Sequence, residues 1–285
     1  MRPYPGNHKE ACRIKNRLLP KLENSGYSEK TMARKSGRVW IGCSGFSYSH
    51  WKDGVFYPPG LAQRQWLEYY AEKFSTVELN VTFYRLPAPA NFISWQARTP
   101  KGFVFVLKGS KLITHLHDLK NVSELVKQFM ERGLLLEEKL GPILWQTKPS
   151  FKKDLPRLQA FVQILSGFPG TRHAFEFRNP TWFDSETYRI LADAGMTVCR
   201  ADQPQGLPEP PDDFPFLYLR RHGPAGQAYR GCYSKEQLET DARLIRKWLG
   251  EGKAVYAYFN NDLGGHAPAN ALELQLLLKQ GPARL

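Results

Sequence analysis

The chain has 285 residues, of which 42% are hydrophobic and 24% charged, a composition typical of a globular protein. Its 40 Lys and Arg residues against 27 Asp and Glu residues give a formal net charge of +13. No apolar run approaches the roughly 18 residues that a membrane-spanning helix needs, and the polar, basic start lacks the apolar stretch of a secretory signal.

The four cysteines, Cys12, Cys43, Cys199 and Cys232, lie far apart and form no CxxC pair. This spacing argues against a disulfide framework or a structural zinc ribbon and suits a reducing compartment. We therefore expect a cytoplasmic protein that has no membrane partner.

Residues 1–38 carry more than half of the positive excess, with ten Lys and Arg residues against three Glu residues. They are poor in aromatic residues, which predicts a flexible extension outside the core. The extension is either a basic arm for nucleic acid or an acidic surface, or a solvated tail. The tail is favoured, because charge alone describes solubility and non-specific binding; an unused upstream start, with Met32 as the true one, and a transit peptide are further alternatives.

Eight short apolar runs beyond the extension predict strands. They are Val39–Cys43, Val77–Asn80, Phe103–Lys108, Pro142–Gln146, Ala174–Arg178, Thr197–Asp202, Phe216–Arg220 and Val255–Asn260. Apolar residues spaced by three and four predict helices between them, with a last helix over Ala267–Leu278. Asn121 with Glu124, and Ser234 with Gln237, have the spacing of capping boxes.

Alternating strands and helices over about 250 residues predict one α/β domain, a TIM (β/α)8 barrel over residues 39–285. Gln203–Phe216 is the irregular connection, because it is rich in Pro, Asp and Glu and has no helical pattern. The alternative is an open doubly wound sheet, which needs a glycine-rich phosphate turn after the first strand. Gly42–Gly45 is too short for that turn, so the barrel is favoured.

Polar side chains end seven of the eight predicted strands. Strand residues alternate between the barrel interior and the helices, so the apolar Val77 and Leu79 leave Glu78 and Asn80 facing inward. The same alternation predicts an inner mouth that includes Lys108, Gln146, Glu176, Arg178, Asp202, Arg220 and His222. Unpaired burial of one such group costs roughly 2–7 kcal/mol, so we favour a functional mouth over a self-satisfied ion-pair network.

At these residues the chain resembles the YecE-like family, also called domain of unknown function 72. The resemblance runs from Val39 to about Leu278. The matching stretches are Gly42–Tyr48 with Trp51, Phe56–Pro58, Val77–Asn80 with Thr82–Tyr84, Thr114–His115, Lys139–Pro142, Glu176–Arg178, Arg221–Gly223, and Tyr258–Asp262 with Ala267–Pro268 and Asn270–Ala271.

The resemblance implies a TIM barrel and no established activity, because the family is named for lacking one. A fold-level likeness to endonuclease IV and xylose isomerase barrels is an analogy only. Three positions depart from the family pattern: Cys43 stands where Thr is usual, Phe46 where Trp is usual, and Lys148 where the first of two prolines is usual.

A divalent metal is one chemistry that the mouth could support, although it is not the favoured one. Ligand types converge there: Glu78, Glu176, Asp202, His115, His222, His266 and Asp262. No tight motif such as HExxH occurs, and Arg178 and Lys108 could neutralise the carboxylates instead.

Acid/base chemistry on an anionic substrate needs only the same groups. Glu78 and Glu176 are the expected proton-transfer pair or metal ligands, and His222 the expected proton shuttle at neutral pH, with Asp202 beside them. The residues expected to bind substrate are Lys108, Arg178, Asn80, Gln146, Arg220, Tyr48, Trp51, Tyr84, His115, Asn260, Asn261 and Asp262. Lysine and arginine side chains are suited to a phosphate group. The aromatic residues at the mouth either stack on a sugar or base ring or only seal the loops.

The sequence therefore predicts an enzyme, a hydrolase or isomerase, for a small anionic sugar, phosphate or nucleotide-like substrate. The alternatives are a nucleic-acid-binding protein or phosphodiesterase and a non-catalytic barrel that binds a metabolite or partner. Serine-hydrolase and P-loop chemistry have no support, because neither GxSxG nor a Walker lysine motif occurs.

Overall fold

The computed structural model describes residues 37–202, 206–224 and 229–279. All but the last two residues of the predicted extension, and the first residues of the irregular connection, lie outside this part. The strands are β1 Val39–Cys43, β2 Thr76–Leu79, β3 Val104–Lys108, β4 Leu140–Gln146, β5 His173–Glu176, β6 Thr197–Val198, β7 Arg200–Asp202, β8 Phe216–Arg221 and β9 Ala254–Phe259. The α-helices are α1 Trp66–Lys73, α2 Val81–Tyr84, α3 Pro89–Ala97, α4 Ser123–Gly133, α5 Leu155–Ser166, α6 Ser185–Asp193, α7 Lys235–Gly250 and α8 His266–Lys279.

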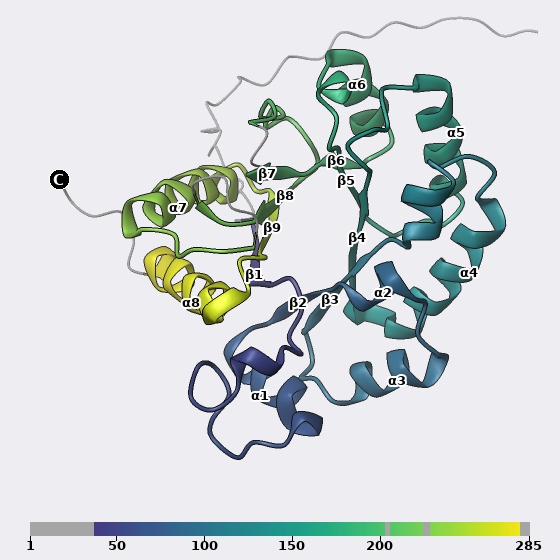
Figure 1. The fold of residues 1–285 in the computed structure, drawn as a ribbon. Helices are drawn as coiled ribbons and strands as arrows, with labels where there is room; N and C mark the ends of the chain where they lie inside the picture. Colours follow the sequence, from purple (N-terminus) through teal and green to yellow (C-terminus); the bar gives the residue numbers. More distant parts are fainter. Residues whose placement is uncertain (1–36, 203–205, 225–228, 280–285) are drawn as a thin grey trace, which may run out of the picture. The chain divides into compact units, whose positions relative to one another are not determined.

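The strands form two parallel sheets (Figure 1). One has four strands in the order β1-β9-β8-β7, and the other has five in the order β2-β3-β4-β5-β6. The fold is therefore mixed α/β, with every strand pair parallel. In Figure 1, α7 and α8 lie outside the four-stranded sheet, and α3, α4 and α5 lie outside the five-stranded one.

Two narrow connections join the sheets. At one, Ser44 forms an isolated parallel bridge with Glu78, and Gly45 N donates to Glu78 O at 2.7 Å. At the other, β6 pairs with β5 and β7 pairs with β8, with only Cys199 between them. Cys199 N donates to Phe175 O of β5 at 2.8 Å, so the chain passes from one sheet to the other with little break in the hydrogen bonding.

The observed elements correct two sequence-based details. The predicted strand Thr197–Asp202 is two short strands interrupted at Cys199. The predicted cap at Asn121 was wrong, because α4 begins at Ser123 with Val122 as its uncapped N-cap residue, and Asn121 adopts a φ of 54°. The Ser234–Gln237 capping box is confirmed at the start of α7, and residues 206–215 contain no helix.

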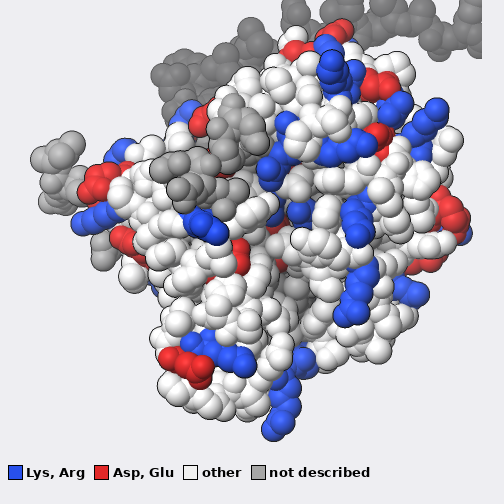
Figure 2. All heavy atoms as spheres, in the orientation of Figure 1, with Lys and Arg blue, Asp and Glu red and all other residues white. Residues whose placement is uncertain are grey.

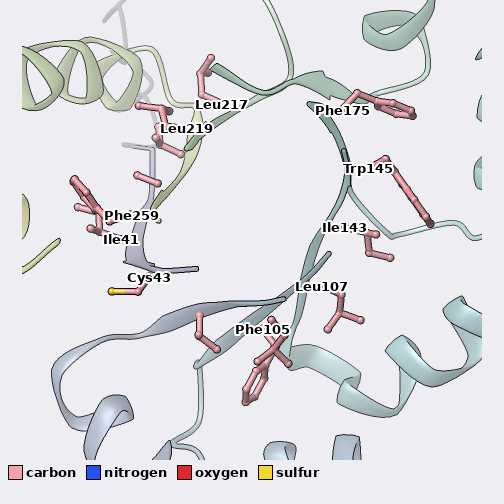
Figure 3. Packing of buried hydrophobic residues seen from close by; sticks show 14 of the residues in the cluster. Ile41, Cys43, Phe105, Leu107, Ile143, Trp145, Phe175, Leu217, Leu219 and Phe259 are labelled. Carbon is pink, nitrogen blue, oxygen red and sulfur yellow. The ribbon is translucent and has the colours of Figure 1, made fainter. Parts of the chain in front are cut away.

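Two apolar clusters flank the strands. The larger one lies between the strands and the helices, and Figure 3 shows its members Ile41, Phe105, Trp145 and Phe175 pointing away from the sheets. The smaller one contains residues of both sheets and none of the helices: Trp40, Val106, Leu144, Ala174, Cys199, Phe216, Tyr218, Tyr256 and Tyr258. The faces of the two sheets that point away from the helices thus share one apolar layer.

Within the described ranges, no helix is long and apolar enough to cross a membrane.

Candidate functional site

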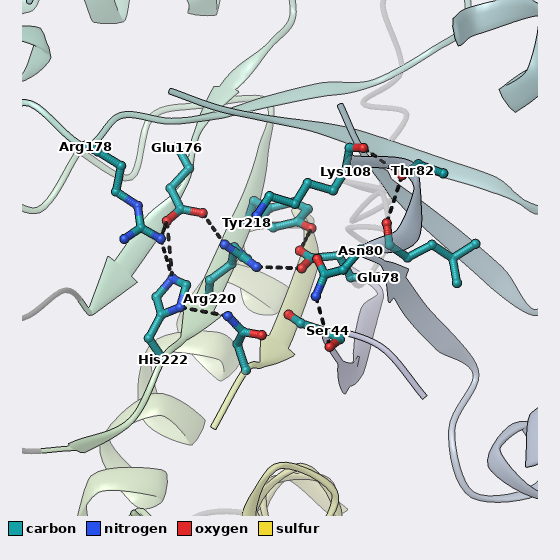
Figure 4. Close-up of polar contacts among 12 residues, drawn as sticks. Ser44, Glu78, Asn80, Thr82, Lys108, Glu176, Arg178, Tyr218, Arg220 and His222 are labelled. Carbon is teal, nitrogen blue, oxygen red and sulfur yellow. Dashed lines mark hydrogen bonds and ion pairs between the residues drawn. The ribbon is translucent and has the colours of Figure 1, made fainter. Parts of the chain in front are cut away.

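Arg220 of β8 lies between the carboxylates of Glu78 and Glu176, which come from β2 and β5 (Figure 4). Its Nη2 is 2.8 Å from Glu78 Oε1 and its Nη1 is 2.5 Å from Glu176 Oε2. All three side chains are buried. The strand alternation explains the placement, since Val77 and Leu79 pack toward the helices and turn Glu78 the other way.

The second oxygen of each carboxylate is also bonded. Tyr218 OH donates to Glu78 Oε2 at 2.6 Å, and Arg178 Nη2 lies 2.6 Å from Glu176 Oε1. Burial alone would raise the pKa of Glu176, but Arg178 and Arg220 outweigh it and hold that pKa well below its ordinary value. All four oxygens of the two carboxylates are thus hydrogen-bonded or ion-paired to neighbouring side chains.

His222 follows β8 and is hydrogen-bonded at both ring nitrogens. Its Nδ1 is 3.0 Å from Asn260 Nδ2, and its Nε2 is 3.2 Å from Glu176 Oε1 and 3.3 Å from Arg178 Nη2. Burial and the nearby Arg220 lower the pKa of His222 to about 4. At neutral pH this ring therefore carries no charge.

Asp202 positions the backbone at His222. Its Oδ1 accepts from His222 N at 2.6 Å, and its Oδ2 accepts from Tyr233 OH. Tyr233 OH in turn accepts from Gly223 N at 2.7 Å. Burial raises the pKa of Asp202. The Asp202 carboxylate therefore holds the backbone that follows β8 in place.

Lys108 is the last residue of β3, and its side chain points toward the Glu78–Arg220 pair (Figure 4). Its Nζ lies 4.3 Å from the centre of the Phe83 ring and, within the described part of the chain, is in no ion pair. Burial, followed by the positive charge of Arg220, lowers the pKa of Lys108 to about 7. The group in this cluster whose pKa lies near neutrality is thus this amine rather than the expected His222.

The amides and aromatics expected at the mouth lie around this cluster. Asn80 Nδ2 donates to Ser44 O at 3.2 Å, and Tyr48 OH donates to the same oxygen at 2.6 Å. His115 packs edge-on against Phe83, with ring centres 5.0 Å apart. Gln146 is the register partner of Glu176.

Other expected residues serve the packing of loops. Trp51 is fully buried and its Nε1 donates to Asp262 O at 2.9 Å. Asn261 Nδ2 donates to Gly231 O at 2.8 Å and is 3.0 Å from Asn270 Oδ1. These contacts tie Trp51 and Asn261 to neighbouring loop segments.

An aromatic cleft of about 480 Å³ lies beside Asn80. Its walls include Phe46, Tyr48, Tyr84 and Trp95, and Tyr84 is 67% exposed. Figure 2 shows a hollow near the middle of the face that it draws, with blue and red atoms at its base. The structure thus places a charged cluster and an aromatic wall on neighbouring segments.

A family model for "Protein of unknown function DUF72" matches residues 40–285. The chain belongs to the DUF72 family. It is 26% identical over 275 residues to the UPF0759 protein YunF of Bacillus subtilis (strain 168), covering 84% of this chain and 94% of the relative. It is 33% identical over 118 residues to the UPF0759 protein YecE of Escherichia coli (strain K12), covering 41% and 43%.

A solved DUF72 structure from Thermotoga maritima MSB8 is 31% identical, with a TM-score of 0.74 over 85% of this chain and 99% of that one. The resemblance to the YecE-like family is thereby confirmed. These matches establish family and fold, so the reaction of this DUF72 chain is argued from its site.

The metal prediction concerns the same carboxylates. In residues 37–202, 206–224 and 229–279, no group of three His, Cys, Asp or Glu side chains is arranged to hold a metal ion. Glu78 and Glu176 instead face Arg220.

Sequence reasoning missed Tyr218 and Ser44 as members of this DUF72 site. Tyr218 is two residues before Arg220 on β8, so the alternation that placed Arg220 inward also places Tyr218 there. Of the departures from the family pattern, Cys43 is fully buried with a raised thiol pKa, and Lys148 pairs with Asp118 at 2.9 Å.

Proposed function

We propose that this protein is an enzyme, of the isomerase or hydrolase type, that binds a small anionic sugar, phosphate or nucleotide-like substrate beside Lys108. The charge arrangement carries the proposal. Two guanidinium groups and two carboxylates balance one another, whereas Lys108 Nζ adds a third cation with no ion-pair partner in the part of the chain that the structure describes. An anionic substrate would supply that partner.

We further propose that residues 39–285 close into a (β/α)8 barrel with this site at its C-terminal mouth. In this arrangement β6 and β7 together are the sixth strand, and the Ser44–Glu78 bridge joins β1 to β2. The apolar layer shared by both sheets supports it, because a closed barrel needs such a filled interior. Glu78, Lys108, Glu176 and Arg220 lie in the last two or three residues of their strands, where barrel enzymes place their chemistry.

Polar atoms near the charged cluster fit the hydroxyl groups of a sugar-like substrate. Ser44 Oγ and Asn80 Oδ1 are buried and have no hydrogen-bond partner within the described residues. Arg178 Nε is in the same condition. Buried polar atoms are normally hydrogen-bonded, so these two acceptors and one donor suit hydroxyls and an anionic oxygen. The aromatic cleft beside Asn80 is then suited to the ring of the substrate.

We also propose that residues 1–38 are an extension separate from the domain formed by residues 39–285. A cytoplasmic location is supported by the free thiols of Cys43, Cys199 and Cys232.

Thermal unfolding in the presence of phosphate, sugar phosphates and nucleotides tests the proposed function. We expect at least one of these anions to raise the unfolding temperature of the wild type but not of Lys108→Met. Lys148→Met is the matched control, because Lys148 already pairs with Asp118, so this variant should respond like the wild type. Equal responses of the wild type and Lys108→Met to every anion would contradict the proposal.

Figure 2 shows basic side chains distributed over the face that it draws, which keeps nucleic acid as the second candidate. Binding of nucleic acid and binding of a small substrate differ in how the affinity depends on salt concentration.

A further inference from the structure

We propose that Lys108 is a covalent nucleophile, and that the substrate is an anionic aldehyde or ketone that forms an imine with Lys108 Nζ. The inference rests on the proposed anion site and names both the substrate class and the reacting atom. It follows from three features of the amine: its backbone support, its apolar and cationic surroundings, and the prior commitment of both nearby carboxylates.

The backbone at Lys108 is held at both ends of the residue. Thr82 Oγ1 donates to Lys108 O at 2.7 Å, and Gly109 N donates to Leu144 O at 2.8 Å. A Cβ on Gly109 would come within 2.2 Å of the Trp145 ring, so this position requires glycine. The backbone at the end of β3 is therefore held in place by these contacts.

The surroundings of the amine favour its neutral, nucleophilic form. Burial and the positive charges of Arg220 and Arg178 favour the neutral amine, and they outweigh the cation–π contact with the Phe83 ring, whose centre lies 4.3 Å from Nζ. A lysine that is desolvated or beside another cation is activated in this way for attack on carbonyl groups. At pH 7, with a pKa of about 7, roughly half of the Lys108 amine is unprotonated, compared with about 1 in 3,000 for an ordinary lysine.

The carboxylates do not reverse this effect, because they are already engaged. Glu78 accepts from Tyr218 and Arg220, and Glu176 pairs with Arg178 and Arg220. Lys139 is a useful contrast, since it is also buried but its Nζ donates to the carbonyls of Gln96 and Thr99, both at 2.6 Å. Lys139 is a structural lysine, whereas Lys108 keeps its amine lone pair and protons for a ligand.

Imine formation at Lys108 needs no reactant other than the carbonyl compound. Nζ attacks the carbonyl carbon and a C–N bond forms while the carbonyl π bond breaks. The carbinolamine oxygen takes up the amine protons and leaves as water, which gives the imine. Water reverses the step and restores the free amine. Arg178, whose Nε has no partner among the described residues, faces the anionic group, which fixes the carbonyl next to Nζ.

Reductive trapping tests the inference on the full chain. The wild type is incubated with glyoxylate, a small anionic aldehyde, and sodium cyanoborohydride, and the modified lysines are identified by peptide mass mapping. We expect Lys108 to be modified on the order of a hundredfold faster than Lys139 or Lys148 at pH 7, with a rate that rises to half its maximum near pH 7. Lys148→Met should trap like the wild type.

Three results would overturn the inference: no preference for Lys108, a trapping rate that rises only near pH 10, or unchanged total modification in Lys108→Met. Propionaldehyde, which carries no charge, separates this inference from the proposed function. Rapid trapping of both aldehydes at Lys108 would retain the nucleophile and remove the anion site. Stabilisation by glyoxylate without trapping would retain the anion site and remove the nucleophile.

Discussion

Replacing Lys108 by Met should make the protein more stable at neutral and acidic pH. In the folded chain the Lys108 pKa is about 7, against an ordinary value of 10.5. Between these two values the unfolded chain binds more protons than the folded one, so the free energy of unfolding of the wild type rises with pH across this window. Methionine keeps much of the side-chain length and removes this titration.

The difference between the two proteins can be calculated from the two pKa values. At 1.36 kcal/mol per pKa unit, the charged amine costs the wild type about 5 kcal/mol at pH 6 and about 2 kcal/mol at pH 9. The stability advantage of Lys108→Met should therefore shrink by about 3 kcal/mol between pH 6 and pH 9. Groups distant from Lys108 titrate alike in both proteins and cancel in the comparison, whereas His115, whose pKa Lys108 lowers, does not.

Urea unfolding at several pH values from 6 to 9 measures this difference, with Lys148→Met as the control. Lys148 is ion-paired with Asp118, so Lys148→Met controls for the removal of a lysine that has a partner. If the free energy of unfolding depended on pH in the same way in the wild type and Lys108→Met, the Lys108 amine would be an ordinary solvated one. The proposed site at Lys108 would then be wrong.

Three further predictions concern the charged cluster and the second candidate function. Arg220→Met leaves Glu78 and Glu176 without their shared cation, so urea unfolding at pH 7 should show a loss of about 3–5 kcal/mol; an unchanged midpoint would refute the pairing. The pKa of Glu176 is lowered in the folded chain, so its contribution is present above the unfolded pKa of about 4.3 and is lost as pH falls through the folded value; Glu176→Gln should therefore flatten the acid limb of stability against pH, and an equally steep limb would count against this assignment. If nucleic acid is the ligand, the affinity of the full chain for DNA or RNA should fall steeply and linearly on a log–log plot against salt, whereas a flat dependence in a fluorescence-anisotropy titration would exclude that function.

The strand positions were predictable because buried strands are short apolar runs between turn signals. β1 has the predicted bounds Val39–Cys43, and most other strands are shifted by one or two residues. The exceptions have local causes. Cys199 hydrogen-bonds toward β5 while Arg200 pairs with β8, so one apolar run became two strands. Asn121 adopts a left-handed conformation that Asn tolerates, and it therefore ends a turn instead of capping α4.

Alternation along each strand also placed Glu78, Glu176 and Arg220 in one group. It did not predict the lowered pKa of Lys108, because that pKa depends first on the burial of the amine and then on the nearby charge of Arg220. Only the distances show that Arg220 engages both Glu78 and Glu176, and that His222 loses its charge beside it. The sequence identifies the charged residues, but their assignment to pairs is a three-dimensional property.

Arg220 also connects the two sheets through its ion pairs. It belongs to the four-stranded sheet, and both of its carboxylate partners belong to the five-stranded one. A ligand that draws on either carboxylate would weaken one of several contacts between the sheets, which also share an apolar layer and the Tyr218–Glu78 and Thr76–Tyr258 hydrogen bonds. Binding of a ligand at the Arg220 cluster would therefore change how tightly the two sheets are held together at this point.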